Sequence, residues 1–303
     1  IIETQYAFAP FGIKNFILSM PIWLKEKLFQ KRLLVNNLRE FDQSADDINK
    51  KLLFSEHHLS HAASAFYPSS FNSSAIVTID GVGEWTTTSI CKGVNEKIEI
   101  LKEIHFPNSL GLLYSTFTSY LGFKVNSGEY KMMGLAPFGE PIYTDLIKKH
   151  LIEINHDGSF KLNMKYFYYC VGDRMFNKKF CKLFNLTPRK PKDEILKIHM
   201  DLACSIQKVI EEVIIKICKY AKFITKEKNL CLSGGVALNC VANGKILKEK
   251  IFDKLWIQPA SGDSGASLGA ALAVNFMHLK RKRLINSNLN TQSVFLGPSY
   301  ETE

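Results

Sequence analysis

The sequence predicts an α/β fold, and two observations support this prediction. In the second half of the chain, a short apolar segment is twice followed by a glycine-rich turn and then by a helical pattern, first from Asn229 and again from Leu255. In the middle of the chain, an apolar segment ends at Asp80 and leads through Gly81-Val82-Gly83 into a second extended segment. The latter pattern is typical of a β-hairpin, and strands alternating with helices are typical of an α/β sheet.

Length and composition indicate how much core the protein can bury. The chain has 303 residues, of which 46% are hydrophobic and 22% charged, enough for one large or two modest domains. We expect no membrane span, because no run of about 18 or more apolar residues occurs. The seven cysteines are scattered without a CxxC pair, which favours reduced thiols in the cytoplasm. Since the chain starts at Ile1 without a Met and ends abruptly at Glu303, we interpret it as a fragment.

The charge balance is basic. The 39 basic and 29 acidic residues give a formal net charge of +10. Such a surface could bind nucleic acid, but it could equally draw in anionic small substrates. The one dense basic cluster is Lys280-Arg281-Lys282-Arg283, which we interpret as a solvated helix end or linker. We therefore expect neither nucleic acid nor a membrane as a partner.

The N-terminal part is predicted to be helical and to lead into a sheet. Residues 10–52 show near-helical apolar spacing with short breaks, one of them at Pro21, and residues 55–67 form a further helical stretch. Apolar segments bounded by turn residues then predict three strands of one sheet, at residues 74–79, 86–92 and 98–105. The glycines after Asp80 are predicted to form the turn between the first two strands.

The remaining elements follow in order. Residues 109–122 have a helical period, and residues 127–139 form a glycine-framed loop around a short helix. Residues 155–192 lack a clear period and are predicted to be an irregular insertion, whereas apolar residues at spacings of three and four predict a long helix over 193–220. The first strand–turn–helix unit has a strand at 229–232, a turn at 234–235 and a helix that starts near Ala237. The second has a strand at 255–257, a turn at 261–265 and a helix that ends near Phe276.

Two histidines are candidate metal ligands. His57 and His61 are four residues apart at the start of a predicted helix, so both imidazoles lie on one face and could reach one ion. Asp80 follows at the end of a strand and offers a carboxylate. The alternative is a helix with two surface or packed histidines. His58 points to another face and is predicted to be a packing or hydrogen-bonding residue.

The glycine-rich turns are candidate phosphate sites. Backbone N–H groups at helix N-termini bind anions well, and glycine lets a ligand approach that backbone closely. Three such turns, at residues 81–83, 234–235 and 261–265, could surround the phosphates of a nucleotide. Each of them alone could equally be a simple tight turn.

Five motifs follow one another in order over most of the chain, from about residue 50 to residue 275. The motifs are EHHLSHAASAF at 56–66, DGVGEW at 80–85, GEYKMMGLA at 128–136, LSGGVALN at 232–239 and GDSG at 262–265. Together they resemble the signatures of the O-carbamoyltransferases of the NodU and CmcH type. This family is in turn similar to the tRNA threonylcarbamoyl-transfer enzymes.

The resemblance implies a fold of the actin, sugar-kinase and heat-shock-chaperone group, with two ribonuclease-H-like lobes around a nucleotide cleft and a truncated N-terminal lobe. Residues 1–72 would be the remnant of that lobe with the metal-binding helix, and 73–276 the second lobe with the nucleotide-binding turns. Residues 277–303 would be a linker into a missing C-terminal YrdC-like domain, whose first residues would be 293–298. A glycine-rich hairpin of the family is expected before residue 1.

The resemblance also implies an activity. A carbamoyl group would pass from carbamoyl-adenylate, made from carbamoyl phosphate and ATP, to a hydroxyl of a small molecule or saccharide. A divalent metal, iron or else zinc or manganese, would be bound and could polarise the carbamoyl carbonyl or a phosphate oxygen. The implied metal ligands are His57, His61, Asp80 and Asp263. The implied nucleotide-binding residues are Gly81, Gly83, Gly234, Gly235 and Asn239, with Glu129 and Lys131 lining the cleft.

Two alternatives remain open. A sugar-kinase-like phosphotransferase would share the fold, but kinases of this group do not need the paired histidines, and they would release ADP and not AMP. A non-catalytic nucleotide- or tRNA-binding module is suggested by the charge of +10. That module would bind RNA at physiological salt, where non-specific phosphate contacts are already weak.

Overall fold

The computed structural model describes residues 2–41, 48–285 and 298. The chain divides into two compact units, each of which is described by itself. One unit comprises residues 1–54 and 163–189, and the other comprises residues 55–162 and 190–303. The division falls between residues 54 and 55, whereas the family resemblance implies a lobe boundary between residues 72 and 73. The assignment of residues 1–72 and 73–276 to evolutionary lobes stays a prediction.

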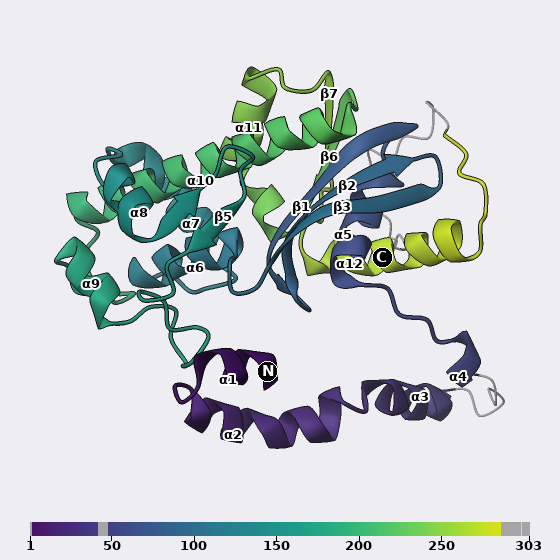
Figure 1. The fold of residues 1–303 in the computed structure, drawn as a ribbon, viewed down its shortest axis with the longest axis horizontal. Coiled ribbons are helices and arrows are strands. Elements are labelled where there is room, and N and C mark those ends of the chain that lie inside the picture. The colour runs from purple at the N-terminus through teal and green to yellow at the C-terminus, as the bar shows by residue number, and fades with distance from the viewer. Residues whose placement is uncertain (1, 42–47, 286–297, 299–303) are drawn as a thin grey trace, which may run out of the picture. The chain divides into compact units, whose positions relative to one another are not determined.

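The larger unit is built on a mixed five-stranded sheet with the strand order β3-β2-β1-β6-β7. Strand β1 pairs antiparallel with β2 and parallel with β6, so β1 joins the hairpin to the strand of the first strand–turn–helix unit (Figure 1). This arrangement confirms the predicted α/β class. The strands are β1 (Ser73–Gly83), β2 (Thr86–Val94), β3 (Lys97–His105), β6 (Asn229–Ser233) and β7 (Lys254–Ile257).

Helices cover both faces of this sheet. Figure 1 shows α5 and α12 along one side of the sheet and α6 and α10 along the other. Because both faces are covered, β1 is buried from Ser74 to Ile79, the part of the strand that carries its apolar residues. The helices of this unit are α5 (His57–Phe66), α6 (Leu110–Tyr120), α7 (Glu129–Leu135), α8 (Thr144–His150), α10 (Lys197–Thr225), α11 (Cys240–Lys248) and α12 (Asp263–Ala273).

Shorter elements complete the larger unit. The 3-10 turns η2 (Ala136–Phe138) and η3 (Gly235–Leu238) follow α7 and β6, and the π-helical turn η4 (Val274–His278) extends α12. A two-stranded ribbon consists of β4 (Ile152–Ile154) and β5 (Phe160–Leu162). Among the described helices, none combines the length and the apolar character needed to span a lipid bilayer.

The smaller unit is mainly helical, as predicted for residues 10–52. Its elements are α1 (Ile2–Phe8), α2 (Ile13–Ile22), η1 (Trp23–Lys27), α3 (Gln30–Phe41), α4 (Ile48–Lys51) and α9 (Lys178–Phe184). The break predicted at Pro21 is wrong, because Pro21 lies inside α2. A π-helical turn follows it directly, a common accommodation where a proline removes a backbone donor.

Three further predictions need correction. Strand β1 continues through Gly83 with a register shift after Ile79, so the hairpin turn falls at Glu84 and Trp85 and not at the glycines. Helix α12 already begins at Asp263, inside the turn predicted over 261–265. The region 155–192, predicted to be irregular, contains β5 and α9, whose short lengths give too few periods to detect in the sequence.

The basic cluster at residues 280–283 matches its prediction as a solvated helix end or linker at Lys280, Arg281 and Lys282, which are exposed, but not at Arg283. The guanidinium of Arg283 is half-buried and donates hydrogen bonds to the backbone carbonyls of Phe66, Tyr67, Ser69 and Phe71. It stacks over the Phe66 ring, 4.5 Å from the ring centroid. Arg283 therefore caps the C-terminal end of α5. The predicted linker 277–303 and its residues 293–298 lie mostly outside the described residues and stay a prediction.

Candidate metal centre

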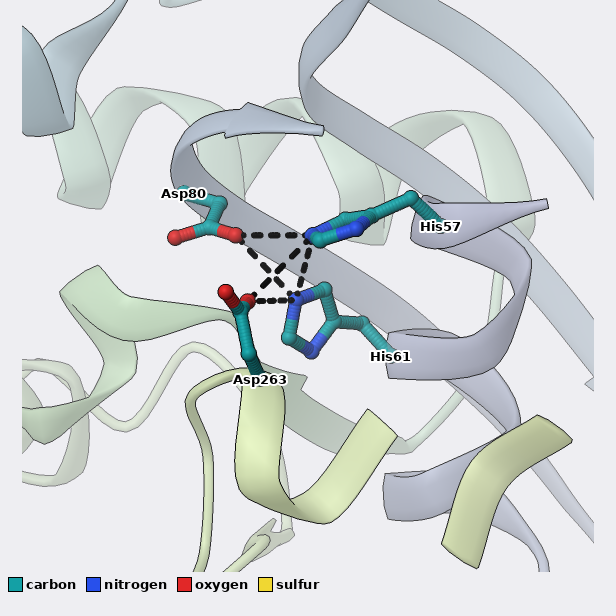
Figure 2. Close-up of side chains that lie close together, drawn as sticks. All are labelled: His57, His61, Asp80 and Asp263. Atoms are coloured by element: carbon teal, nitrogen blue, oxygen red, sulfur yellow. Dashed lines mark hydrogen bonds and ion pairs between the residues drawn. The ribbon is translucent and has the colours of Figure 1, made fainter. Parts of the chain in front are cut away.

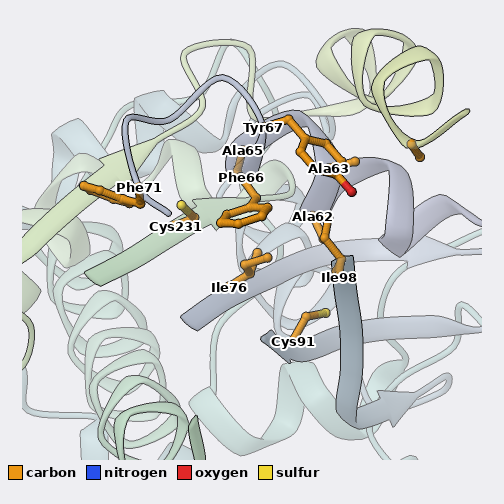
Figure 3. Packing of buried hydrophobic residues seen from close by; sticks show 11 residues of the cluster. Ala62, Ala63, Ala65, Phe66, Tyr67, Phe71, Ile76, Cys91, Ile98 and Cys231 are labelled. Atoms are coloured by element: carbon orange, nitrogen blue, oxygen red, sulfur yellow. The ribbon is translucent and has the colours of Figure 1, made fainter. Parts of the chain in front are cut away.

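Helix α5 presents His57 and His61 from its first two turns. The helix starts directly after Glu56, whose carbonyl accepts the amide N–H of Ser60. The other face of α5 is apolar and packs into the core of the larger unit, where Phe66 contacts the sheet (Figure 3). This packing leaves the helix little freedom to rotate, so both imidazoles remain directed toward the end of strand β1.

The two imidazoles and Asp80 meet at the end of β1. The Nε2 atoms of His57 and His61 are 3.0 Å apart and lie 3.0 Å and 3.1 Å from the Oδ2 atom of Asp80 (Figure 2). The hydrogen bond to Asp80 raises the pKa of His57 above its ordinary value of 6.5, although burial opposes the shift. The structure thus places both histidines on one face of α5 with Asp80 beside them, whereas their binding of a metal stays a prediction.

The carboxylate of Asp80 is held from both sides. Its Oδ1 atom accepts the backbone N–H of Gly81 at 2.8 Å and that of Gly235 at 3.2 Å, which leaves Oδ2 for the histidines. Burial alone would raise the pKa of Asp80. The hydrogen bonds from His57 and His61 outweigh it and hold this pKa well below its usual range. Asp80 is therefore ionised and fixed in orientation at neutral pH.

Asp263 completes the group from a third element. It is the first residue of α12, and its Oδ1 atom lies 3.5 Å from His57 Nε2 and 3.6 Å from His61 Nε2. One nitrogen or oxygen atom of each of the four residues lies within 4.8 Å of the others. His61 is fully buried, whereas the Asp263 side chain is 78% exposed, so the group opens to solvent on the α12 side. Two imidazoles and two carboxylates at this spacing could hold a divalent ion.

His58 has the separate role that the sequence predicted. Its Nδ1 atom is 2.6 Å from the hydroxyl of Thr78, which in turn contacts the hydroxyl of Ser89 at 2.7 Å. Burial lowers the pKa of His58 to about 4, so the ring is neutral at physiological pH. His58 thus fastens α5 to the sheet from beside the ligand pair.

The predicted nucleotide-binding glycines lie around the four residues. A Cβ atom on Gly83 would be 2.1 Å from the His57 ring, and one on Gly235 would be 3.0 Å from Asp80 Oδ1. Gly234 has φ 89°, and a Cβ atom there would lie 2.3 Å from the carbonyl oxygen of Ile79. Close packing thus leaves no room for a side chain at Gly83 and Gly234 and little room at Gly235, whereas a Cβ atom on Gly81 would meet nothing within 4 Å. Their contact with a nucleotide stays a prediction.

The other three predicted nucleotide-binding residues lie apart from the metal group. The Asn239 side chain caps α11 at Ala242 and exchanges two hydrogen bonds of 3.0 Å with the Gln207 amide. The Glu129 carboxylate accepts hydrogen bonds within its own loop and from the Ser115 hydroxyl. Lys131 is exposed, with its ammonium 5.8 Å from the ring centroid of its neighbour Tyr130. Their roles toward a nucleotide also stay predictions.

Comparison with known proteins decides the family. Residues 2–272 match the family model described as the carbamoyltransferase N-terminus. The chain belongs to the carbamoyltransferase family. This finding confirms the family predicted from the five motifs, and the match covers both compact units.

Relatives within the carbamoyltransferase family are considerably longer than this chain. An uncharacterized protein of Synechocystis is 49% identical over all 303 residues, which cover 49% of that protein. The nodulation protein NolNO of Sinorhizobium fredii is 35% identical over 92% of the chain and 38% of its own length. The chain thus spans about half or less of these relatives. A crystal structure of HypF from T. kodakarensis aligns with 78% of the chain and 38% of HypF, at 14% identity and a TM-score of 0.42.

A buried polar network in this carbamoyltransferase chain was not predicted. The Gln207 amide accepts the Tyr114 hydroxyl at 2.9 Å and donates to Glu211 at 3.0 Å, and Glu211 in turn pairs with Lys245. Together with Asn239, these residues support the segment that follows Gly235. The only sequence signal for it is polar residues such as Gln207 at core positions of the 193–220 helical pattern.

Proposed function

We propose that this chain is the transferase part of an O-carbamoyltransferase. It would transfer a carbamoyl group from carbamoyl-adenylate to a hydroxyl of a small molecule or saccharide. Family membership supports carbamoyl chemistry in general. The observation that carries the proposal is that His57, His61, Asp80 and Asp263 converge from three elements although they are up to about two hundred residues apart in sequence.

The donor set fits a divalent metal. Metal–nitrogen and metal–oxygen bonds of about 2.0–2.2 Å place ligands of one ion within roughly 4 Å of one another, near the spacing of these four side chains. Iron is the proposed ion, with zinc or manganese as alternatives, because imidazole and carboxylate ligands suit all three. When bound, the ion would act as a Lewis acid toward a carbonyl or phosphate oxygen.

The protein's own groups would keep this site rigid. The two backbone N–H groups on Asp80 Oδ1 fix the direction of its Oδ2 lone pairs, and the packing of α5 fixes the imidazoles. Preorganised ligands of this kind need no rearrangement when charge develops during a reaction. The Nδ1 atom of His61 is buried without a hydrogen-bond partner among the described residues, which is compatible with a ring held by its Nε2 side.

The proposed transfer exchanges one bond for another. The acceptor hydroxyl oxygen forms a bond to the carbamoyl carbon, and the bond from that carbon to the phosphate oxygen of the adenylate breaks. AMP leaves with the electron pair of the broken bond, and the hydroxyl proton passes to solvent. Of the proposed nucleotide-binding glycines, Gly81 and Gly235 already donate their N–H groups to Asp80, and Gly234 donates its N–H group to the carbonyl of Ser261.

The proposed context follows the family resemblance. Carbamoyl-adenylate would be made from carbamoyl phosphate and ATP by a YrdC-like domain, and the two ribonuclease-H-like lobes would flank the nucleotide. The mixed sheet with its order β3-β2-β1-β6-β7 supports one such lobe. The seven cysteines are all free thiols, which supports a cytoplasmic location.

A product assay on the full-length protein tests the proposal. The protein is supplied with carbamoyl phosphate, ATP and a panel of hydroxylated acceptors, and carbamoylated product and AMP are measured by mass spectrometry. We expect the His57→Ala/His61→Ala double variant to abolish transfer, whereas His156→Ala, an exposed histidine elsewhere in the larger unit, has wild-type turnover. Unchanged transfer in the double variant would contradict the role of the metal site. Release of ADP together with a phosphorylated product would show that the protein is a kinase and would contradict carbamoyl transfer.

A further inference from the structure

Helix α12 contacts α5 at a glycine. Gly269 is buried in the middle of α12, against the backbone of α5. A Cβ atom on Gly269 would lie 1.8 Å from the carbonyl oxygen of Ser60 and 2.9 Å from the amide nitrogen of Ser64. Both are backbone atoms, so neither can rotate out of the way as a side chain could. The two helices reach this separation only because residue 269 has no side chain.

The contact lies beside the candidate ligands. Ser60 directly precedes His61 and follows His57 by three residues, so it belongs to the turn of α5 that carries both imidazoles. Asp263 begins α12 within about two turns of Gly269. Because a short helix moves as a rigid body, the spacing at Gly269 determines where Asp263 lies relative to the histidines.

The displacement that a methyl group at residue 269 would cause is large compared with the tolerance of metal–ligand bond lengths. Ordinary van der Waals contact begins at 3.4 Å, so a methyl group at residue 269 would separate the helix backbones by on the order of 1.5 Å. Metal–ligand bonds vary by only about 0.2 Å around their ideal lengths. A shift of that order would therefore take the Asp263 carboxylate, now 3.5 Å from His57 Nε2, out of coordination range.

We propose that Gly269 is a positioning residue of the metal site, which brings α12 close enough to α5 for Asp263 to act as a ligand. The inference rests on the proposed function, because it takes Asp263 as a ligand. Gly265 lies one turn earlier on the same face of α12, but it does not contact α5 in this way. A Cβ atom there would meet the carbonyl of Ala260 in the preceding loop and not α5.

The first test measures Zn²⁺ affinity by competition with a chromophoric chelator. Gly269→Ala weakens binding about 10- to 100-fold, the range known for residues that orient ligands. The matched control is Gly244→Ala in α11, where a Cβ atom would meet nothing within 4 Å, and its affinity equals that of the wild type. Wild-type affinity in Gly269→Ala would overturn the inference while leaving the metal site intact. No Zn²⁺ binding by the wild type, with Fe²⁺ and Mn²⁺ also negative, would overturn the site itself.

A second test separates positioning from general packing. Asp263→Glu lengthens the side chain by one methylene, so its carboxylate can reach further. In the Gly269→Ala background it should raise the Zn²⁺ affinity at least tenfold. Asp263→Asn combined with Gly269→Ala should lose no more affinity than Asp263→Asn alone. No rescue by glutamate, or fully additive losses, would overturn the inference. If Gly269→Ala does not fold, the test is Asp263→Glu in the otherwise unchanged protein. With α12 and α5 at their native spacing, the longer side chain should weaken Zn²⁺ binding. Unchanged Zn²⁺ affinity would contradict the proposal.

Discussion

At the scale of single residues, the site depends on how Asp80 divides its two oxygens. One oxygen is held by the N–H groups of Gly81 and Gly235, and the other faces His57 and His61. The same contacts raise the pKa of His57 and lower that of Asp80. A metal would replace the proton that these groups share, because imidazole binds an ion only in its neutral form.

This exchange predicts a pH dependence of metal binding. Asp80 stays ionised through the neutral range, so the competing proton is that of His57, whose pKa lies above 6.5. Affinity should therefore be highest in weakly alkaline buffer and fall as the pH drops through that pKa, with a proton released on binding. Calorimetric titrations with Zn²⁺ in buffers of different ionisation enthalpy measure this release. Affinity that stays constant between pH 8 and pH 6 would contradict the assignment of His57 as a ligand.

Gly83 gives a second prediction at this scale. A methyl group at this position would lie 2.1 Å from the His57 ring, so the imidazole must turn away. His57 is 23% exposed and can move into solvent, so Gly83→Ala should leave the fold intact while weakening metal binding about 10- to 100-fold. Gly134→Ala, with open space at its Cβ, serves as the control in the same affinity measurement. Equal affinities of the two variants would refute this explanation of Gly83.

At the scale of elements, α5 is fixed at both ends. Its first turns are fastened to the sheet through His58 and Thr78, and its C-terminal carbonyls are capped by Arg283. A guanidinium at this end also complements the negative pole of the helix dipole. Hydrogen bonds to charged groups contribute about 1.5–3 kcal/mol each when buried, and part of this is offset because Arg283 is only half-buried.

Arg283→Ala should therefore lower the free energy of unfolding by about 2 kcal/mol. Arg283→Lys should recover little of it, because an ammonium cannot match the planar fork that serves several carbonyls. Lys282→Ala, the exposed neighbour, should change stability by less than about 0.5 kcal/mol. Urea unfolding followed by circular dichroism measures all three variants. A loss as small for Arg283→Ala as for Lys282→Ala would show that the cap is not stabilising.

Some features of the site could be predicted from local sequence patterns, whereas others depend on how separate elements pack together. The spacing of His57 and His61 is a property of one helix, so local reasoning could place both imidazoles on one face as candidate ligands. Asp263 was assigned through family resemblance, since nothing near it in sequence indicates that α12 packs on α5. The contacts of Gly83 with His57 and of Gly269 with Ser60 depend on distances between elements, which periodicity does not contain. Arg283 was misread for the same reason, because a basic cluster carries no signal of a distant helix end.

At the scale of the whole molecule, the predicted class was correct because the strand and helix periods are clear. The parallel pairing of β1 with β6 joins residues about 150 apart, and it brings the Gly234–Gly235 turn next to Asp80. Neither the strand order nor that contact could be read from local patterns. The site is therefore assembled by the tertiary fold from parts that are individually unremarkable turns and helix ends.

Such an assembly predicts that metal stabilises the fold. Because one ion would join α5, β1 and α12, binding at 100 times the dissociation constant should add about 2.7 kcal/mol to the free energy of unfolding. Thermal unfolding with added Zn²⁺ or with a chelator measures the difference. The His57→Ala/His61→Ala variant provides the control, and we expect its midpoint to be insensitive to both additions. A wild-type midpoint that does not respond would contradict a shared metal site.

The most direct measurement is an anomalous-difference map from crystals of the metal-loaded protein, collected at the absorption edge of the ion. We predict one strong peak about 2.0–2.2 Å from the Nε2 atoms of His57 and His61 and from one carboxylate oxygen of each of Asp80 and Asp263. A map without a peak at these four side chains, or with the ion bound elsewhere, would contradict the assignment of these residues as the ligands of a metal.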